Sequence, residues 1–143
     1  METGRNMKAI CKTKAEKGAT ICEIPIPVIG REEVLIKVKC AALCNSDVEV
    51  YHYTPLVEKA AYALPFVMGH EFSGEIIEVG EDVVGFQIGD HVAAETHIPC
   101  GYCETCRGGH QHICGNHMGV LGRTVDGCFA EYIKLHQKAL IKL

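Results

Sequence analysis

The stretch CGYCETCRGGHQHIC, residues 100–114, holds four of the nine cysteines of this chain at a spacing typical of a metal site. Two residues separate Cys100 from Cys103 and Cys103 from Cys106, and Cys114 follows after seven more. Such short steps let the backbone turn around a zinc ion while presenting sulfur from several sides. Because four thiolates fill a tetrahedral shell, we expect a structural zinc that replaces the core this glycine-rich segment cannot build.

The same cysteines have other interpretations. Residues 1–17 lack the apolar run of a secretory signal, which predicts a cytoplasmic location where disulfides are disfavoured. Redox-active or incidental thiols are then the alternative to zinc. His110, His112 and His117 could compete as ligands, but four cysteines already complete the shell, so we expect these histidines to be surface residues.

Outside this stretch, short apolar runs recur between turn signals, as in a mainly β domain. The length of 143 residues, with 48% apolar and 22% charged residues, suits one globular domain. A short helix is expected over residues 46–53. The expected strands cover residues 7–12, 19–24, 34–42, 72–79, a short pair within 86–94, and 128–135.

The charge and the hydropathy of the chain argue against two classes of partner. The net charge is −4 and the positive residues are scattered, which gives little support for binding nucleic acid. No run approaches the roughly 18 apolar residues of a membrane-spanning helix. We therefore expect no nucleic-acid partner and no membrane span.

Two further segments place metal-binding side chains at the ends of expected strands. Cys44 follows strand 34–42, and His70 and Glu71 precede strand 72–79. Alone, a cysteine after a strand is more often a core residue, and a His-Glu pair is usually a solvated turn. Together they could meet in one cleft as three protein ligands with one open position, which is the arrangement of a catalytic zinc.

The motifs of this chain are similar, in their order, to those of the zinc-containing medium-chain alcohol dehydrogenases over nearly the whole length. Within that family, residues 95–101 (ETHIPCG) look most like threonine dehydrogenase, with the sorbitol and other polyol dehydrogenases next. The motifs are residues 44–47 (CNSD), 69–71 (GHE), 89–92 (GDHV), the four-cysteine stretch and residues 127–132 (GCFAEY).

The resemblance implies a GroES-like, partly open β-barrel over residues 1–143, with an inserted structural-zinc lobe at about residues 98–118. This would be the catalytic domain of a two-domain enzyme. The nucleotide-binding Rossmann domain is absent from this chain, because no two glycines are separated by a single residue and a Gly-x-Gly-x-x-Gly fingerprint cannot occur. We expect the chain to be part of a longer protein.

Residue by residue, the resemblance makes Cys44 and His70 catalytic zinc ligands, and Glu71 a residue that binds the zinc directly or through water. A further ligand in many relatives lies beyond position 143, so the site in this chain would be incomplete. Asp47 resembles the carboxylate that orients the ligand histidine and raises its basicity. Ser46 occupies the hydroxyl position of the family's proton relay.

The implied reaction is oxidation of a secondary alcohol such as threonine or a polyol. Zinc activates the alcohol, Ser46 passes its proton toward solvent, and a hydride passes to NAD or NADP in the missing domain. The full-length enzyme would be a homo-oligomer, either a dimer or a tetramer.

The chain departs from the threonine and polyol dehydrogenases at two positions. Glu49 stands where they usually have a histidine, and Asn45 where they usually have glycine. A carboxylate can relay protons, so Glu49 is a candidate catalytic residue, although it could simply favour the first turn of a helix. His52 could replace the missing histidine, the alternative being an exposed helix position.

Two other functions compete with the dehydrogenase. A stand-alone zinc-stabilised binding module would use the barrel as an interaction surface and perform no chemistry, but it would not need a relay hydroxyl beside an open metal site. A zinc-ribbon nucleic-acid binder is disfavoured by the acidic balance of the chain.

Overall fold

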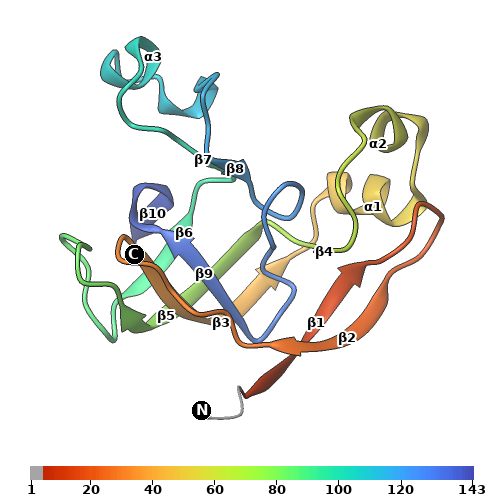
Figure 1. Ribbon diagram of the computed structural model, residues 1–143, viewed down its shortest axis with the longest axis horizontal. Helices are drawn as coiled ribbons and strands as arrows, with labels where there is room; N and C mark the ends of the chain where they lie inside the picture. Colours follow the sequence, from red (N-terminus) through yellow and green to blue (C-terminus); the bar gives the residue numbers. More distant parts are fainter. Residues whose placement is uncertain (1–4) are drawn as a thin grey trace.

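A computed structural model describes residues 5–143, and Figure 1 shows strands that curl around one another below a separate lobe. Residues 1–4 lie outside that range. They belong to the segment 1–17, in which we expect no secretory signal. The expected mainly β, partly open barrel with an inserted lobe is confirmed. No helix in the described part of the chain is long and apolar enough to cross a membrane.

The strands of residues 5–143 form three sheets, all with antiparallel pairing. A three-stranded sheet has the order β2 (Thr20–Pro25), β1 (Asn6–Lys12), β4 (Phe66–Val67). The five-stranded sheet has the order β10 (Leu140–Lys142), β6 (His91–Ala94), β5 (Glu71–Val79), β3 (Glu33–Ala42), β9 (Tyr132–His136). At the base of the lobe, β7 (His97–Ile98) pairs with β8 (Gly119–Val120).

The helices are short and lie between strands. Two of them, α1 (Asn45–His52) and α2 (Pro55–Ala60), connect β3 to β4, and α1 matches the helix expected over residues 46–53. The lobe contains α3 (Glu104–Arg107) and the 3₁₀ turn η1 (Gln111–Ile113). A second 3₁₀ turn, η2 (Gln137–Ala139), joins β9 to β10.

The main core lies between the strands of the five-stranded sheet and the turn that follows β8. It forms because alternate residues of each strand point to the same face, so the apolar positions of neighbouring strands meet. The fully buried residues of this cluster include Val34, Ile36, Ile76, Val92 and Leu121. This core holds β3 and β5 rigidly side by side, and the candidate metal ligands lie at one end of that pair.

Two strand predictions were wrong in extent. Within residues 86–94 only β6 forms, because residues 86–90 make a turn in which the Asp90 carboxylate accepts a hydrogen bond from the Gln87 amide. The last strand begins at Tyr132 instead of residue 128. Residues 127–129 instead donate backbone hydrogen bonds to the carbonyls of Val67, Met68 and Gly69, which draws them away from β3.

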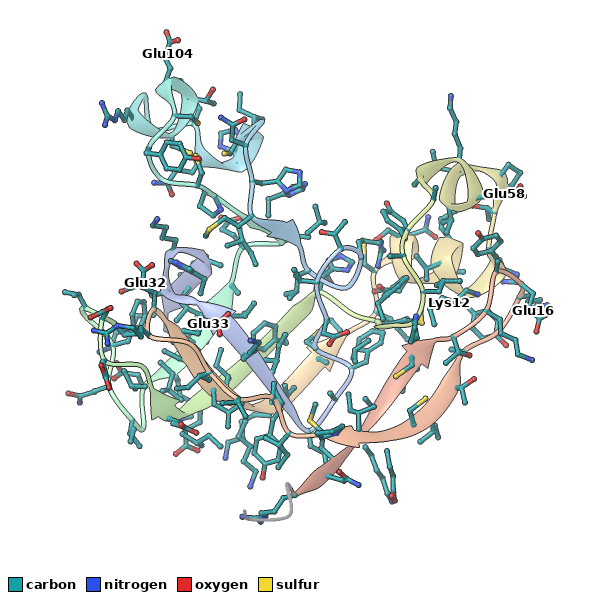
Figure 2. The ribbon with its side chains drawn as sticks, in the orientation of Figure 1. Lys12, Glu16, Glu32, Glu33, Glu58 and Glu104 are labelled. Carbon is teal, nitrogen blue, oxygen red and sulfur yellow. The ribbon has the colours of Figure 1, made fainter. Side chains whose placement is uncertain are left out.

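A buried lysine ties the β1–β2 turn to the first helix. Lys12 is 1% exposed, and its ammonium donates to the carbonyls of Glu16, Gly18 and Tyr51. Figure 2 shows Lys12 inside the molecule and Glu16 at the outer edge of the turn. Three donors meeting three acceptors satisfy a charge that would otherwise be costly to bury, and they anchor the C-terminal end of α1.

Candidate metal centres

The four lobe cysteines converge on one point. Three of the distances between their Sγ atoms are 3.9 Å for Cys100 and Cys106, 3.8 Å for Cys103 and Cys114, and 3.6 Å for Cys114 and Cys100. A tetrahedral zinc with bonds of about 2.3 Å to sulfur holds its ligands about 3.8 Å apart. The thiol arrangement therefore fits a zinc ion that has no open position.

The surroundings of these thiols fit the same role. Cys100, Cys106 and Cys114 are buried and Cys103 is partly buried, and these four cysteines are the cluster around which the lobe is packed. Burial raises the pKa of the Cys100 thiol, but hydrogen bonds from the amides of Tyr102 and Cys103 and from neighbouring thiols outweigh it and lower that pKa to about 6. These contacts favour a thiolate, the form that binds zinc, at Cys100, whereas burial and the three neighbouring thiols raise the pKa of Cys106 to about 12.

A second group of metal-binding atoms lies where β3 ends and β5 begins. Cys44 is the N-cap of α1, Glu71 is the first residue of β5, and His70 immediately precedes it. One ligand atom from each of the three residues lies within 4.8 Å of the others. Glu71 Oε1 is 4.0 Å from His70 Nε2, so this imidazole nitrogen faces the other ligands. The structure thus brings together the three residues that the sequence singled out.

Asp47 lies behind this group and faces the other imidazole nitrogen. Its side chain is fully buried, Oδ2 accepts a hydrogen bond of 3.1 Å from the Cys44 amide, and Oδ1 lies 3.4 Å from His70 Nδ1. That contact is too poorly aligned for a hydrogen bond, so Nδ1 is buried without a partner. Metal-binding histidines commonly direct the second ring nitrogen to a carboxylate, and this arrangement has the same layout.

The position of His70 depends on a close crossing of two backbone segments. Gly69 has φ of +88°, and its Cα faces the ring of Phe129. A Cβ on Gly127 would overlap the carbonyl oxygen of Gly69, so these segments touch through their backbones. Only glycine gives this approach without displacing the chain, and the crossing holds His70 against α1.

Ser46 lies beside a residue that the sequence analysis missed. Ser46 is the second residue of α1, and its hydroxyl accepts a 3.0 Å hydrogen bond from Arg123 Nη2. Arg123 is only 7% exposed, and its Nη1 lies 3.5 Å from Asp47 Oδ1. An isolated arginine in a turn is part of no spacing pattern. The sequence therefore gave no indication that Arg123 contacts Ser46 and Asp47.

The remaining candidates lie outside both groups. Glu49 is on α1, and its carboxylate accepts a 2.7 Å hydrogen bond from the Thr54 hydroxyl. His52 is exposed at the end of α1 and packs edge-on against Tyr51. The lobe histidines His110, His112 and His117 are exposed, and neither metal-binding group found among residues 5–143 includes them.

The chain resembles dehydrogenases of known sequence. A family model for the alcohol dehydrogenase GroES-like domain matches residues 30–143. L-threonine 3-dehydrogenase from Escherichia coli O1:K1 / APEC is 45% identical over 127 residues, which make up 89% of this chain and 37% of that enzyme. The chain therefore spans little more than a third of the length of the curated relatives that it matches.

Solved structures show the same fold. Galactitol-1-phosphate dehydrogenase from Escherichia coli matches with a TM-score of 0.83 and 33% identity, over 96% of this chain and 38% of that chain. A protein from Escherichia coli CFT073, described as a short chain alcohol dehydrogenase and complexed with NADH, matches with a TM-score of 0.81 and 36% identity. That match covers 98% of this chain and 39% of the other.

Proposed function

The chain belongs to the alcohol dehydrogenase GroES-like domain family, and on that premise we propose that it is the catalytic part of a zinc-dependent dehydrogenase that oxidises a secondary alcohol. One observation carries the proposal: the ligand atoms of Cys44, His70 and Glu71 converge while Asp47 stands behind the histidine. A stand-alone binding module would have no use for this arrangement.

Two zinc ions have different roles in the proposal. Cys100, Cys103, Cys106 and Cys114 hold one that stabilises the lobe, in place of an apolar core. Cys44, His70 and Glu71 hold the other, with a position left for substrate. When bound there, zinc supplies a Lewis acid that favours loss of the alcohol proton.

The protein residues position the reactants and move the proton. Asp47 fixes the orientation of the His70 ring, since its carboxylate faces Nδ1 and leaves Nε2 directed at the metal position. The Ser46 hydroxyl receives the proton of the alcohol and releases its own toward solvent. Glu49 lies about one turn further along α1 and is proposed to accept the proton next. To do so, its carboxylate would give up the hydrogen bond from the Thr54 hydroxyl.

The substrate and cofactor are inferred from the relatives. Because a threonine 3-dehydrogenase is 45% identical, we take a 3-hydroxy amino acid or a polyol as the substrate class. The nicotinamide cofactor, NAD or NADP, is proposed to bind to a second domain. The relatives are long enough to contain such a domain in addition to the part that this chain matches. The whole enzyme is proposed to be a homo-oligomer. No disulfide joins any of the nine cysteines, all of which lie within residues 5–143. We propose a cytoplasmic location.

The metal site can be tested on the chain itself. We expect one tightly held zinc after purification and a second metal ion that binds more weakly when Co²⁺ is added. The His70→Ala variant should lose the second ion and keep the first, whereas His112→Ala, an exposed histidine of the lobe, should keep both. Loss of the tight zinc in His70→Ala, or an unchanged second ion, would refute the assignment.

The reaction is tested in a protein that joins this chain to a nicotinamide-binding domain. We expect reduction of NAD or NADP with threonine or a polyol, and loss of that activity in His70→Ala. The chain alone should oxidise no alcohol, because the hydride acceptor is not positioned against the substrate. Turnover by the isolated chain would contradict the two-domain arrangement.

A further inference from the structure

Arg123 joins the two residues on which the proposed chemistry depends. Its side chain is 8% exposed and lies in the turn between β8 and β9. Nη2 donates to Ser46 Oγ at 3.0 Å, Nη1 lies 3.5 Å from Asp47 Oδ1, and Nη1 also donates to the carbonyl of its neighbour Gly122 at 2.6 Å. The two terminal nitrogens of the planar Arg123 guanidinium thus contact Ser46 and Asp47, which are adjacent residues at the start of α1.

The rigid shape of the Arg123 guanidinium lets it position both side chains at once. The terminal nitrogens of a guanidinium have a fixed separation, so contacting Ser46 with one and Asp47 with the other sets where both side chains lie. A hydroxyl that accepts a hydrogen bond from arginine must direct its own hydrogen elsewhere, because arginine cannot accept it. Arg123 also supplies the cationic partner that a fully buried carboxylate such as Asp47 requires.

We infer that Arg123 is a positioning residue that holds the Ser46 hydroxyl and the Asp47 carboxylate in the arrangement used by the proposed metal site. Asp47 in turn faces the Nδ1 atom of His70, so Arg123 acts on the metal ligand through one intermediate residue. This inference rests on the proposed function for its chemical purpose. The contacts themselves do not depend on that function.

Metal affinity distinguishes positioning from simple electrostatics, because the two effects have opposite signs. A guanidinium near a metal position repels a dication, so removing its charge would by itself tighten metal binding. Removing a group that positions a residue behind the ligands weakens metal binding, by about tenfold or more in known sites. The direction of the change therefore identifies the role of Arg123.

The experiment titrates Co²⁺ into the chain with its lobe zinc in place. We expect Arg123→Met to weaken binding of this second ion about tenfold, and Arg123→Lys, which keeps the charge without the fork, to fall between Arg123→Met and the parent. Arg5→Met, which removes an exposed arginine, should change nothing. Retained lobe zinc shows that each variant has folded. Unchanged or tighter Co²⁺ binding in a folded Arg123→Met variant would overturn the inference.

A thermal unfolding cycle tests the contacts independently of the second metal. Arg123→Lys and Ser46→Ala are made singly and together, and the midpoint of unfolding is measured for each without added Co²⁺. If Arg123 holds Ser46, the double variant loses less than the sum of the single losses. Strictly additive losses would overturn the inference. If the parent chain binds no second ion, the proposed function fails, and the cycle still decides whether Arg123 positions Ser46.

Discussion

The backbone of Gly127 lies directly against that of Gly69, one residue before the candidate ligand His70. The contact is reinforced on both sides, since the Gly127 amide donates to the Val67 carbonyl and the Cys128 amide donates to the Gly69 carbonyl. The two segments come from opposite halves of the chain, and their crossing determines where His70 stands relative to α1.

Substituting Gly127 by alanine should therefore damage both stability and the metal site. The added methyl group would overlap two carbonyl oxygens, and an overlap with backbone cannot be relieved by turning a side chain. We expect a loss of about 3 kcal/mol in the free energy of unfolding. Chemical denaturation measures this, and Gly115→Ala is the control because a Cβ there meets nothing within 4 Å. Equal stability of the two variants would contradict the crossing.

The lobe should depend on its zinc. Cys103→Ser removes one of four ligands, so we expect the purified chain to lose about one equivalent of zinc and on the order of several kcal/mol of stability. Metal analysis and thermal unfolding provide the measurements. Cys22→Ser, a cysteine of β2 outside the lobe, should keep the zinc. A Cys103→Ser chain with parental zinc content and midpoint would rule out the structural site.

Ser46→Ala should affect turnover more than substrate binding. The hydroxyl is proposed to carry the proton, so we expect kcat to fall by about 10²–10⁴-fold while KM changes little. Steady-state kinetics of the protein that joins this chain to a nicotinamide-binding domain would measure both constants. A rise in KM at constant kcat would show instead that the hydroxyl holds the substrate.

Glu49 can be tested against its hydrogen-bond partner. Both Glu49→His and Thr54→Val break the hydrogen bond between these side chains, so each should cost about 1 kcal/mol of stability. If Glu49 carries protons, only Glu49→His should also shift the pH profile of kcat and the preference among threonine, polyols and simple secondary alcohols. Identical profiles for the two variants would leave Glu49 with a structural role alone.

Acid should weaken the attachment of the last strand. The Lys142 ammonium, 2.7 Å from Asp90 Oδ2, together with the Gln87 amide, holds the pKa of the Asp90 carboxyl below its ordinary value. A lowered folded-state pKa gives stability that is present above the unfolded value of about 4 and is lost as the pH falls through the lower folded value.

The variant Asp90→Asn should thus unfold a few degrees earlier than the parent at neutral pH, and this difference should shrink below about pH 4. Thermal unfolding across pH measures both effects. Glu58→Gln is the control, because Glu58 is an exposed residue of α2 (Figure 2). A difference that persists unchanged at low pH would show that the Asp90 charge does not contribute.

Expectations based on local sequence were the most accurate. The strand expected over residues 7–12 and the short helix expected over residues 46–53 form close to those bounds, although the N-cap of the helix is Cys44. The strand expected from residue 128 starts four residues later, because Gly127, Cys128 and Phe129 pair with the segment before His70. Alternation of apolar residues reports that a segment is extended, but it does not report which segment it pairs with.

The four-cysteine group was determined by the sequence alone, because all its ligands lie within fifteen residues and the short steps between them leave few ways to surround an ion. The second group was only suggested, since Cys44 and His70 meet through the pairing of β3 with β5. The contact of Arg123 with Asp47, 76 residues apart, was decided by tertiary structure. Its physical reason is burial: a charged side chain enclosed by the fold must find a partner among the groups that packing brings to it, whatever their separation along the chain.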